Sequence, residues 1–256
     1  MNEFREWLRF AHMGFGFVGL MAFWIPVVTR KGSIGHVRFG TVFLWCVYGI
    51  AASAFIATSH EMYLAIRSGG GPATDPSGFG FAIFLFYIAL ITLASGRHGY
   101  RVVETKNDPT EINTTAHRLL AIASMAGSVI TIAYALLFWS GLSIIFLALG
   151  PIGIGIGSSM LRYMRDPAVS KMAWWYEHMG AMLGAGVAFH TAFVVFGAQR
   201  LFDYAGSLGA LAWLPWVLPA SVGIPASIIW TRYYRRKFGD LPASAPRPQV
   251  RHRGTP

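Results

Sequence analysis

The chain has 256 residues, of which 54% are hydrophobic and only 12% carry a charge. A soluble domain carries about 25% charged residues, so the composition excludes an ordinary soluble globular domain and indicates a surface that is compatible with lipid. The net charge of +10 favours anionic lipid headgroups as partners and no nucleic acid, and a single cysteine excludes an internal disulfide framework.

Apolar stretches long enough to cross a bilayer follow one another along most of the chain. A transmembrane helix needs about 20 mostly apolar residues. Seven stretches approach this length: 10–28, 39–59, 79–96, 119–139, 142–161, 172–196 and 209–231. We therefore expect an all-α integral membrane protein, in which residues 1–239 form a seven-helix bundle. Gly150 and Pro151 predict an irregular fifth helix. Residues 240–256 are basic and rich in Pro, which predicts a disordered cytoplasmic tail.

The Lys and Arg residues predict the orientation of this bundle. Seventeen of the 21 fall in the loops after the first, third and fifth spans and in the C-terminal segment. The other side of the membrane keeps Arg5, Arg9, Arg67 and Arg200. Because cytoplasmic loops are enriched in Lys and Arg, we expect the N-terminus outside and the C-terminus in the cytoplasm.

Histidines in and beside the spans fall at two expected depths. His178 and His190 lie twelve residues apart in one span, which corresponds to about 18 Å along a helix. Placing the other histidines by their distance from the span ends gives an outer layer of His12, His60 and His190, and an inner layer of His36, His98, His117 and His178.

Two layers of histidine resemble a transmembrane b-type cytochrome with a haem near each surface, because imidazole ligates haem iron from facing helices. The deepest candidates for metal ligands are His12, His178 and His190, and His36 and His117 are further cofactor-binding candidates. Glycines that follow His12 and His178 would let a macrocycle approach the backbone. The spacing Gly180-x-x-x-Gly184 is equally an ordinary helix-packing motif.

Neighbouring side chains leave other chemistries open. Met13, Met179 and Met182 beside the histidines make copper the second choice of cofactor. Glu177 is the only carboxylate within a predicted span, and we expect it to act with His178 as a proton relay. The chain is then either a membrane oxidoreductase or electron carrier, with a quinone or another redox partner, or a non-redox protein. In the second case it is a proton-coupled transporter or an assembly or sensing scaffold. The sequence leaves open whether it forms an oligomer.

Three segments resemble a family of bacterial multi-pass membrane proteins of unknown function. They are the stretch AHMGFGFVGLMAFWIPVVTRKGSIGHVRFG, the HRLL that begins at His117, and WWYEHMGAMLGAGVAFHTAF. The residues on the family pattern are Lys31, Gly32, His36, Gly40, His117, Arg118, His178, Met182, Thr191, Ala192 and Phe193. The family pattern has Arg directly after the His of its turn, whereas here Val37 separates His36 from Arg38. The resemblance implies a shared fold and a bacterial inner-membrane location, and it supplies no activity.

Overall fold

The computed structural model describes residues 2–166, 170–202 and 205–240, and the predicted tail from 241 onward lies outside this range. The described residues form helices and short connections, with no strand among them. The α-helices are α1 (Asn2–Val28), α2 (Ile34–Arg67), α3 (Pro76–Glu104), α4 (Thr115–Leu137), α5 (Ser143–Leu149), α6 (Ile152–Arg165), α7 (Ala173–Ala192), α8 (Gln199–Phe202), α9 (Ala205–Leu208) and α10 (Leu214–Lys237). Short 3₁₀ turns cover Pro109–Ile112 and Gly209–Leu211, and a π-helical segment, Phe193–Ala198, extends α7.

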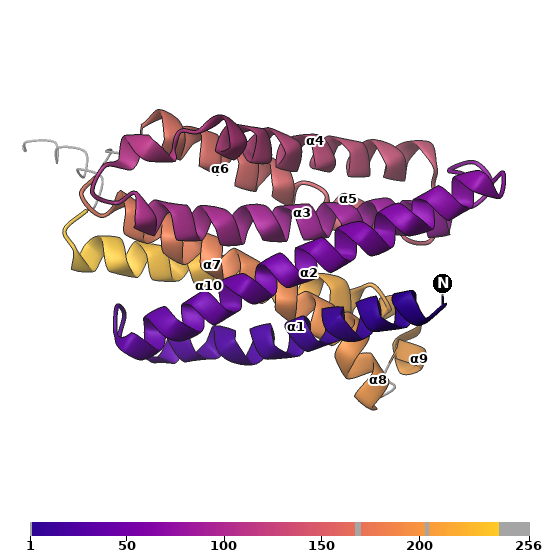
Figure 1. The fold of residues 1–256 in the computed structure, drawn as a ribbon, viewed down its shortest axis with the longest axis horizontal. Coiled ribbons are helices and arrows are strands. Elements are labelled where there is room, and N and C mark those ends of the chain that lie inside the picture. Colours follow the sequence, from indigo (N-terminus) through magenta and orange to yellow (C-terminus); the bar gives the residue numbers. More distant parts are fainter. Residues whose placement is uncertain (1, 167–169, 203–204, 241–256) are drawn as a thin grey trace, which may run out of the picture.

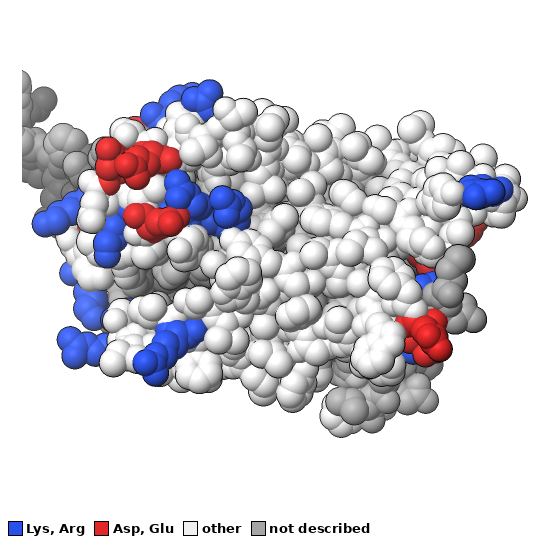
Figure 2. Space-filling view, in the orientation of Figure 1, with Lys and Arg blue, Asp and Glu red and all other residues white. Residues whose placement is uncertain are grey.

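The expected seven membrane-spanning helices are confirmed in the described part of the chain. Those long and apolar enough to cross a membrane are Glu3–Val28, Ile34–Arg67, Pro76–Glu104, Thr115–Leu137, Ser143–Arg165, Ala173–Ala198 and Leu214–Lys237. They lie side by side as an elongated bundle (Figure 1). Charged side chains gather at its two ends, and a wide band without them lies between (Figure 2). The molecule is a multi-pass membrane protein.

One end of the bundle holds most of the Lys and Arg, and we call it the basic end. It contains the α1–α2 and α3–α4 connections and the C-terminal end of α10, at the left of Figures 1 and 2. In the α1–α2 turn, Lys31 Nζ donates to the carbonyls of Pro26 and Val27 at 2.7 and 2.8 Å. These are carbonyls that the end of α1 leaves without helical partners. Partial desolvation against this helix end lowers the pKa of Lys31.

The fifth span is broken, as Gly150 and Pro151 predict. The hydroxyl of Tyr87 on α3 fills the break: it donates toward the carbonyl of Gly150 at 2.7 Å and accepts from the amide of Gly153 at 2.8 Å. Tyr87 is 2% exposed, so water does not reach these groups. The tyrosine thus satisfies backbone atoms that α5 and α6 cannot pair by themselves.

Tyr87→Phe should therefore lower the free energy of unfolding by about 1–3 kcal/mol, because it leaves buried backbone groups without a partner. Tyr100→Phe on the same helix is the control, since Tyr100 is 41% exposed. Thermal unfolding in detergent measures the difference. Equal stability of the two variants would show that the Tyr87 hydroxyl does not support the break.

Glycines let α1 and α7 pack closely. A methyl group added at Gly186 would lie 2.2 Å from Cε2 of Phe23, and one added at Gly19 would lie 2.3 Å from Cε1 of Phe189. These two glycines are covered by phenylalanine rings, so they serve helix packing. The expectation that glycines following His12 and His178 make room for a macrocycle is therefore wrong for Gly19 and Gly186.

Gly186→Ala should destabilise the fold by about 1–3 kcal/mol through overpacking against Phe23. Gly180→Ala, six residues earlier on α7, is the matched control, because no atom lies within 4 Å of an added methyl there. That control should be neutral or stabilising, since alanine is the better helix former. Thermal stability of the two variants checks the prediction, and a loss in Gly180→Ala as large as in Gly186→Ala would contradict it.

Candidate functional site

Four histidines of the expected inner layer gather at the basic end, where α2, α3, α4 and α7 meet. Helix caps place two of them. Ser33 accepts a hydrogen bond from the backbone amide of His36 at the start of α2, and Thr114 accepts one from the amide of His117 at the start of α4. Because such caps fix where a helix begins, they set which way the side chain three residues later leaves the helix.

His36 and His178 form a pair, which we call the histidine pair. Their ring centroids lie 6.2 Å apart, and the ring planes are inclined at 59°. They come from α2 and α7, 142 positions apart in sequence, and both side chains are half-buried. Each ring has one hydrogen bond to a backbone carbonyl.

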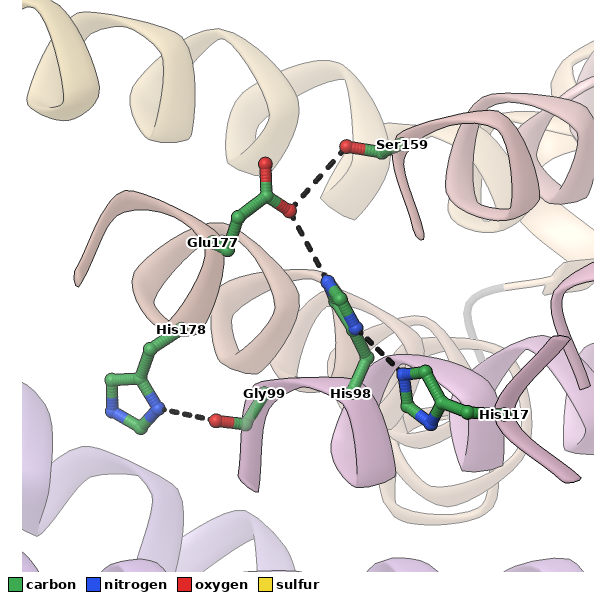
Figure 3. Close-up of polar contacts among 6 residues, drawn as sticks. All are labelled: His98, Gly99, His117, Ser159, Glu177 and His178. Atoms are coloured by element: carbon green, nitrogen blue, oxygen red, sulfur yellow. Dashed lines mark hydrogen bonds and ion pairs between the residues drawn. The ribbon is translucent and has the colours of Figure 1, made fainter. Parts of the chain in front are cut away.

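Those contacts define the tautomer of each ring. Nδ1 of His178 donates to the carbonyl of Gly99 at 2.8 Å, and Nδ1 of His36 donates to the carbonyl of Pro26 at 3.1 Å. A neutral imidazole whose Nδ1 carries the proton has a lone pair on Nε2. Figure 3 shows the second ring nitrogen of His178 pointing away from Gly99. The pair therefore offers two lone pairs, each oriented by a backbone carbonyl, which is the usual support of a histidine that binds a metal.

A second arrangement lies on the other side of α3, and we call it the buried polar chain: Ser159, Glu177, His98 and His117 (Figure 3). Nε2 of His98 donates to Oε2 of Glu177 at 3.2 Å, and Nδ1 of His98 lies 3.0 Å from Nε2 of His117. Ser159 donates to the same Oε2 at 3.4 Å. Both histidines are only 2% exposed, whereas the side chain of Glu177 is 28% exposed, so the chain joins α6, α7, α3 and α4 with its histidine end fully buried.

His98 belongs to this cluster, although the sequence does not mark it as a candidate ligand. The predicted third span ends at 96, which places His98 beyond the helix, whereas α3 continues to Glu104. Val102 is fully buried one turn later. The apolar side chains at 102 and 103 continue the helical spacing past His98, and this signal could have placed the histidine inside the bundle.

The expected outer layer is not found. His190 contacts Trp24, whose Nε1 donates to Nε2 of His190 at 3.1 Å, while Nδ1 of His190 donates to the carbonyl of Gly186 at 2.7 Å. Trp24 lies twelve residues from His12 on α1, about 18 Å along the helix. His12 and His190 therefore lie at different depths, and both ring nitrogens of His190 are engaged within the protein.

His12 has a different surrounding. Its Nδ1 lies 2.8 Å from Oγ of Ser53, whose hydroxyl donates to the carbonyl of Gly49 at 2.7 Å. The serine proton is thus used elsewhere, so His12 donates from Nδ1 and keeps a lone pair on Nε2. His60, on α2, is half-buried. The structure brings neither of them to the histidine pair.

The donor set limits the kind of metal centre. Within the described residues, no group of three or more His, Cys, Asp or Glu side chains has the geometry to hold a metal ion. Structural zinc takes four protein ligands and catalytic zinc three, so the histidine pair does not meet the needs of zinc. Haem brings four nitrogen ligands of its own and needs only two axial side chains. Two histidines on facing helices match that requirement.

Fold and site together define a multi-pass helical membrane protein with a cluster of histidines embedded at its basic end. Comparison with protein families, with curated proteins and with solved structures finds no match.

Proposed function

We propose that the protein binds one haem b between His36 and His178 and carries electrons within the membrane. The observation that carries the proposal is the histidine pair itself: two rings 6.2 Å apart, on separate helices, each with its Nδ1 held by a backbone carbonyl. Bundles of membrane helices build cofactor sites in this way, from side chains on facing helices.

The separation of the rings would allow His36 and His178 to hold one metal ion between them. A nitrogen–metal bond of about 2.0 Å plus about 1.1 Å from nitrogen to ring centre puts each centroid about 3 Å from a central metal. Two rings on opposite sides are then about 6 Å apart, against the 6.2 Å of the pair. Beside His36, a methyl group added at Gly40 would meet only Cγ of Pro26, at 3.9 Å, so the surroundings of this glycine are not tightly packed.

In this function the haem supplies one-electron chemistry, and the protein supplies orientation and tuning. The carbonyls of Gly99 and Pro26 hold the ring planes and strengthen Nε2 of each histidine as a ligand. Lys31, adjacent to the pair in the α1–α2 turn, places a positive charge nearby, which favours the reduced state of a redox centre. A quinone in the bilayer or a redox protein at the basic end is the proposed partner.

The location follows from the same arrangement. The basic end carries the excess of Lys and Arg that marks a cytoplasmic face, so we propose that it faces the cytoplasm of a bacterial inner membrane, with the N-terminus on the other side. The haem then lies in the cytoplasmic half of the bilayer.

The colour of the purified protein tests the function. Expressed with ample haem, the wild type should have a Soret band and a reduced-minus-oxidised difference spectrum, and a pyridine haemochrome assay should give about one haem per chain. Protein without haem under these conditions would end the proposal. Copper in the same preparation, measured by elemental analysis, would indicate that the histidine pair binds copper instead of haem.

The buried polar chain supports a second candidate function. A carboxylate in contact with a buried histidine, which in turn contacts a second buried histidine, is typical of proton relays in pumps and transporters. A proton-coupled transporter would acidify or alkalise liposomes when its substrate is added, and it would bind no haem. A redox protein would show haem and no such flux.

A further inference from the structure

Two neighbouring residues of α3 contact two neighbouring residues of α7. His98 donates to Glu177, and the carbonyl of the next residue, Gly99, accepts from the next residue of α7, His178. Figure 3 shows both contacts, with the two α7 side chains directed to different sides of the same stretch of α3. Successive residues on a helix point about 100° apart, so the contacts constrain the two helices in different directions.

The first of these contacts is anchored from two further helices. His117 on α4 holds the other nitrogen of His98, and Ser159 on α6 donates to the carboxylate of Glu177. His98 and His117 are 2% exposed, so neither can replace its partner by water. A slide of α3 against α7 would have to break a buried hydrogen bond at His98, which costs more than one at the surface.

The second contact has no such anchor of its own. Gly99 contributes only its backbone carbonyl, and the position of that carbonyl depends on the position of α3. Side chains of α7 pack closely against Gly99: a Cβ added there would lie 3.1 Å from Cγ of Met182 and 3.2 Å from Cβ of Ala181. This packing brings α3 and α7 close together at the carbonyl that His178 contacts.

We propose that His98 and Glu177 are positioning residues for His178: their contact fixes α3 against α7 so that the carbonyl of Gly99 meets Nδ1 of His178. The histidine is thereby held as the Nδ1-protonated tautomer, with the lone pair on Nε2. The consequence for a bound haem rests on the proposed function, while the effect on the ring of His178 does not.

The experiment is nuclear magnetic resonance of the full-length protein without haem, with ¹⁵N-labelled histidine. The readouts are the tautomer of His178 and the solvent exchange of its Nδ1 proton, assigned with His178→Ala. In the wild type, His178 should be protonated at Nδ1 and exchange slowly. In Glu177→Ala and His98→Ala the exchange should be about fivefold faster or more, since the loss of one hydrogen bond changes an equilibrium by about that factor.

Glu177→Gln separates position from charge. The amide oxygen of Gln still accepts from Nε2 of His98, so this variant should restore slow exchange at His178 although the negative charge is gone. His60→Ala, a histidine outside the cluster, should leave the exchange as in the wild type. If an alanine variant does not fold, Glu177→Leu provides the same loss of contact with a side chain of similar volume.

Two results would overturn the proposal. One is unchanged exchange at His178 in Glu177→Ala and Glu177→Leu. The other is exchange in Glu177→Gln as fast as in Glu177→Ala, which would show that charge and not position matters. With haem bound, the alanine variants should in addition shift the midpoint potential, and Glu177→Gln should shift it less. A wild type that binds no haem would contradict the proposed function and leave the measurements on His178 valid.

Discussion

Replacing His36 or His178 by alanine should reduce bound haem to background. In the proposed function His36 and His178 would each hold the haem from one side, and a haem that has lost one of two histidine ligands is expected to dissociate during purification or to show a shifted Soret band. The pyridine haemochrome assay counts the haem that remains, and the visible spectrum reports its coordination. Because the rings come from α2 and α7, either loss should have the same effect.

His60→Ala is the control for this experiment, because His60 lies away from the pair on α2. His190→Ala separates one haem from two. Both ring nitrogens of His190 are engaged by Trp24 and Gly186, so a single site at His36 and His178 predicts full haem in this variant. Two haems, as the histidine depths in the sequence suggest, predict a loss of about half. Retention of haem in His36→Ala and His178→Ala would show that the ligands lie elsewhere.

The membrane fold could be predicted from the sequence because its determinants are local. A bilayer requires about 20 apolar residues per span, and this requirement is visible in any window of the chain. The break in the fifth span was also visible, at Gly150 and Pro151. The partner that fills the break, Tyr87, was not, because it lies more than sixty residues away and its role depends on how α3 packs.

The site was predicted in part. Counting residues from the span ends placed His36, His98, His117 and His178 near one surface, and these four do lie at the basic end. The same counting failed for His12 and His190, because it treats helices as parallel rods with aligned ends. In the bundle α2 runs obliquely across its neighbours (Figure 1), so the helices are not parallel rods with aligned ends. His190 contacts Trp24, which lies twelve residues beyond His12 on α1.

The depth of a residue along its span does not tell which side chains contact one another. The sequence suggested that Glu177 acts with its neighbour His178, yet the two point in different directions and contact different parts of α3. Glu177 binds His98, and His178 binds the backbone of Gly99. A backbone carbonyl has no residue type, so no sequence pattern marks Gly99 as the group that orients His178.

Reporter fusions should give an all-or-none result for the orientation of the bundle. Alkaline phosphatase is active only outside the cytoplasm, and seventeen of the 21 Lys and Arg residues fall on one side of the predicted spans. A fusion after Gly70, in the α2–α3 connection, should be active, and one after Lys106, just beyond α3, should be inactive. Only α3 separates these two points, so they must lie on opposite sides of the membrane if α3 spans it.

Two further fusions control for damage to the fold. A fusion after Ser140, between α4 and α5, should be active like the one after Gly70, because two spans separate these points. A fusion after Gly239, at the end of α10, should be inactive like the one after Lys106, because four spans separate them. Phosphatase activity in the fusions after Lys106 and Gly239, with none in those after Gly70 and Ser140, would show that the orientation is the opposite of the predicted one. The histidine pair would then lie near the outer surface, and its redox partner would have to be sought on that side of the membrane.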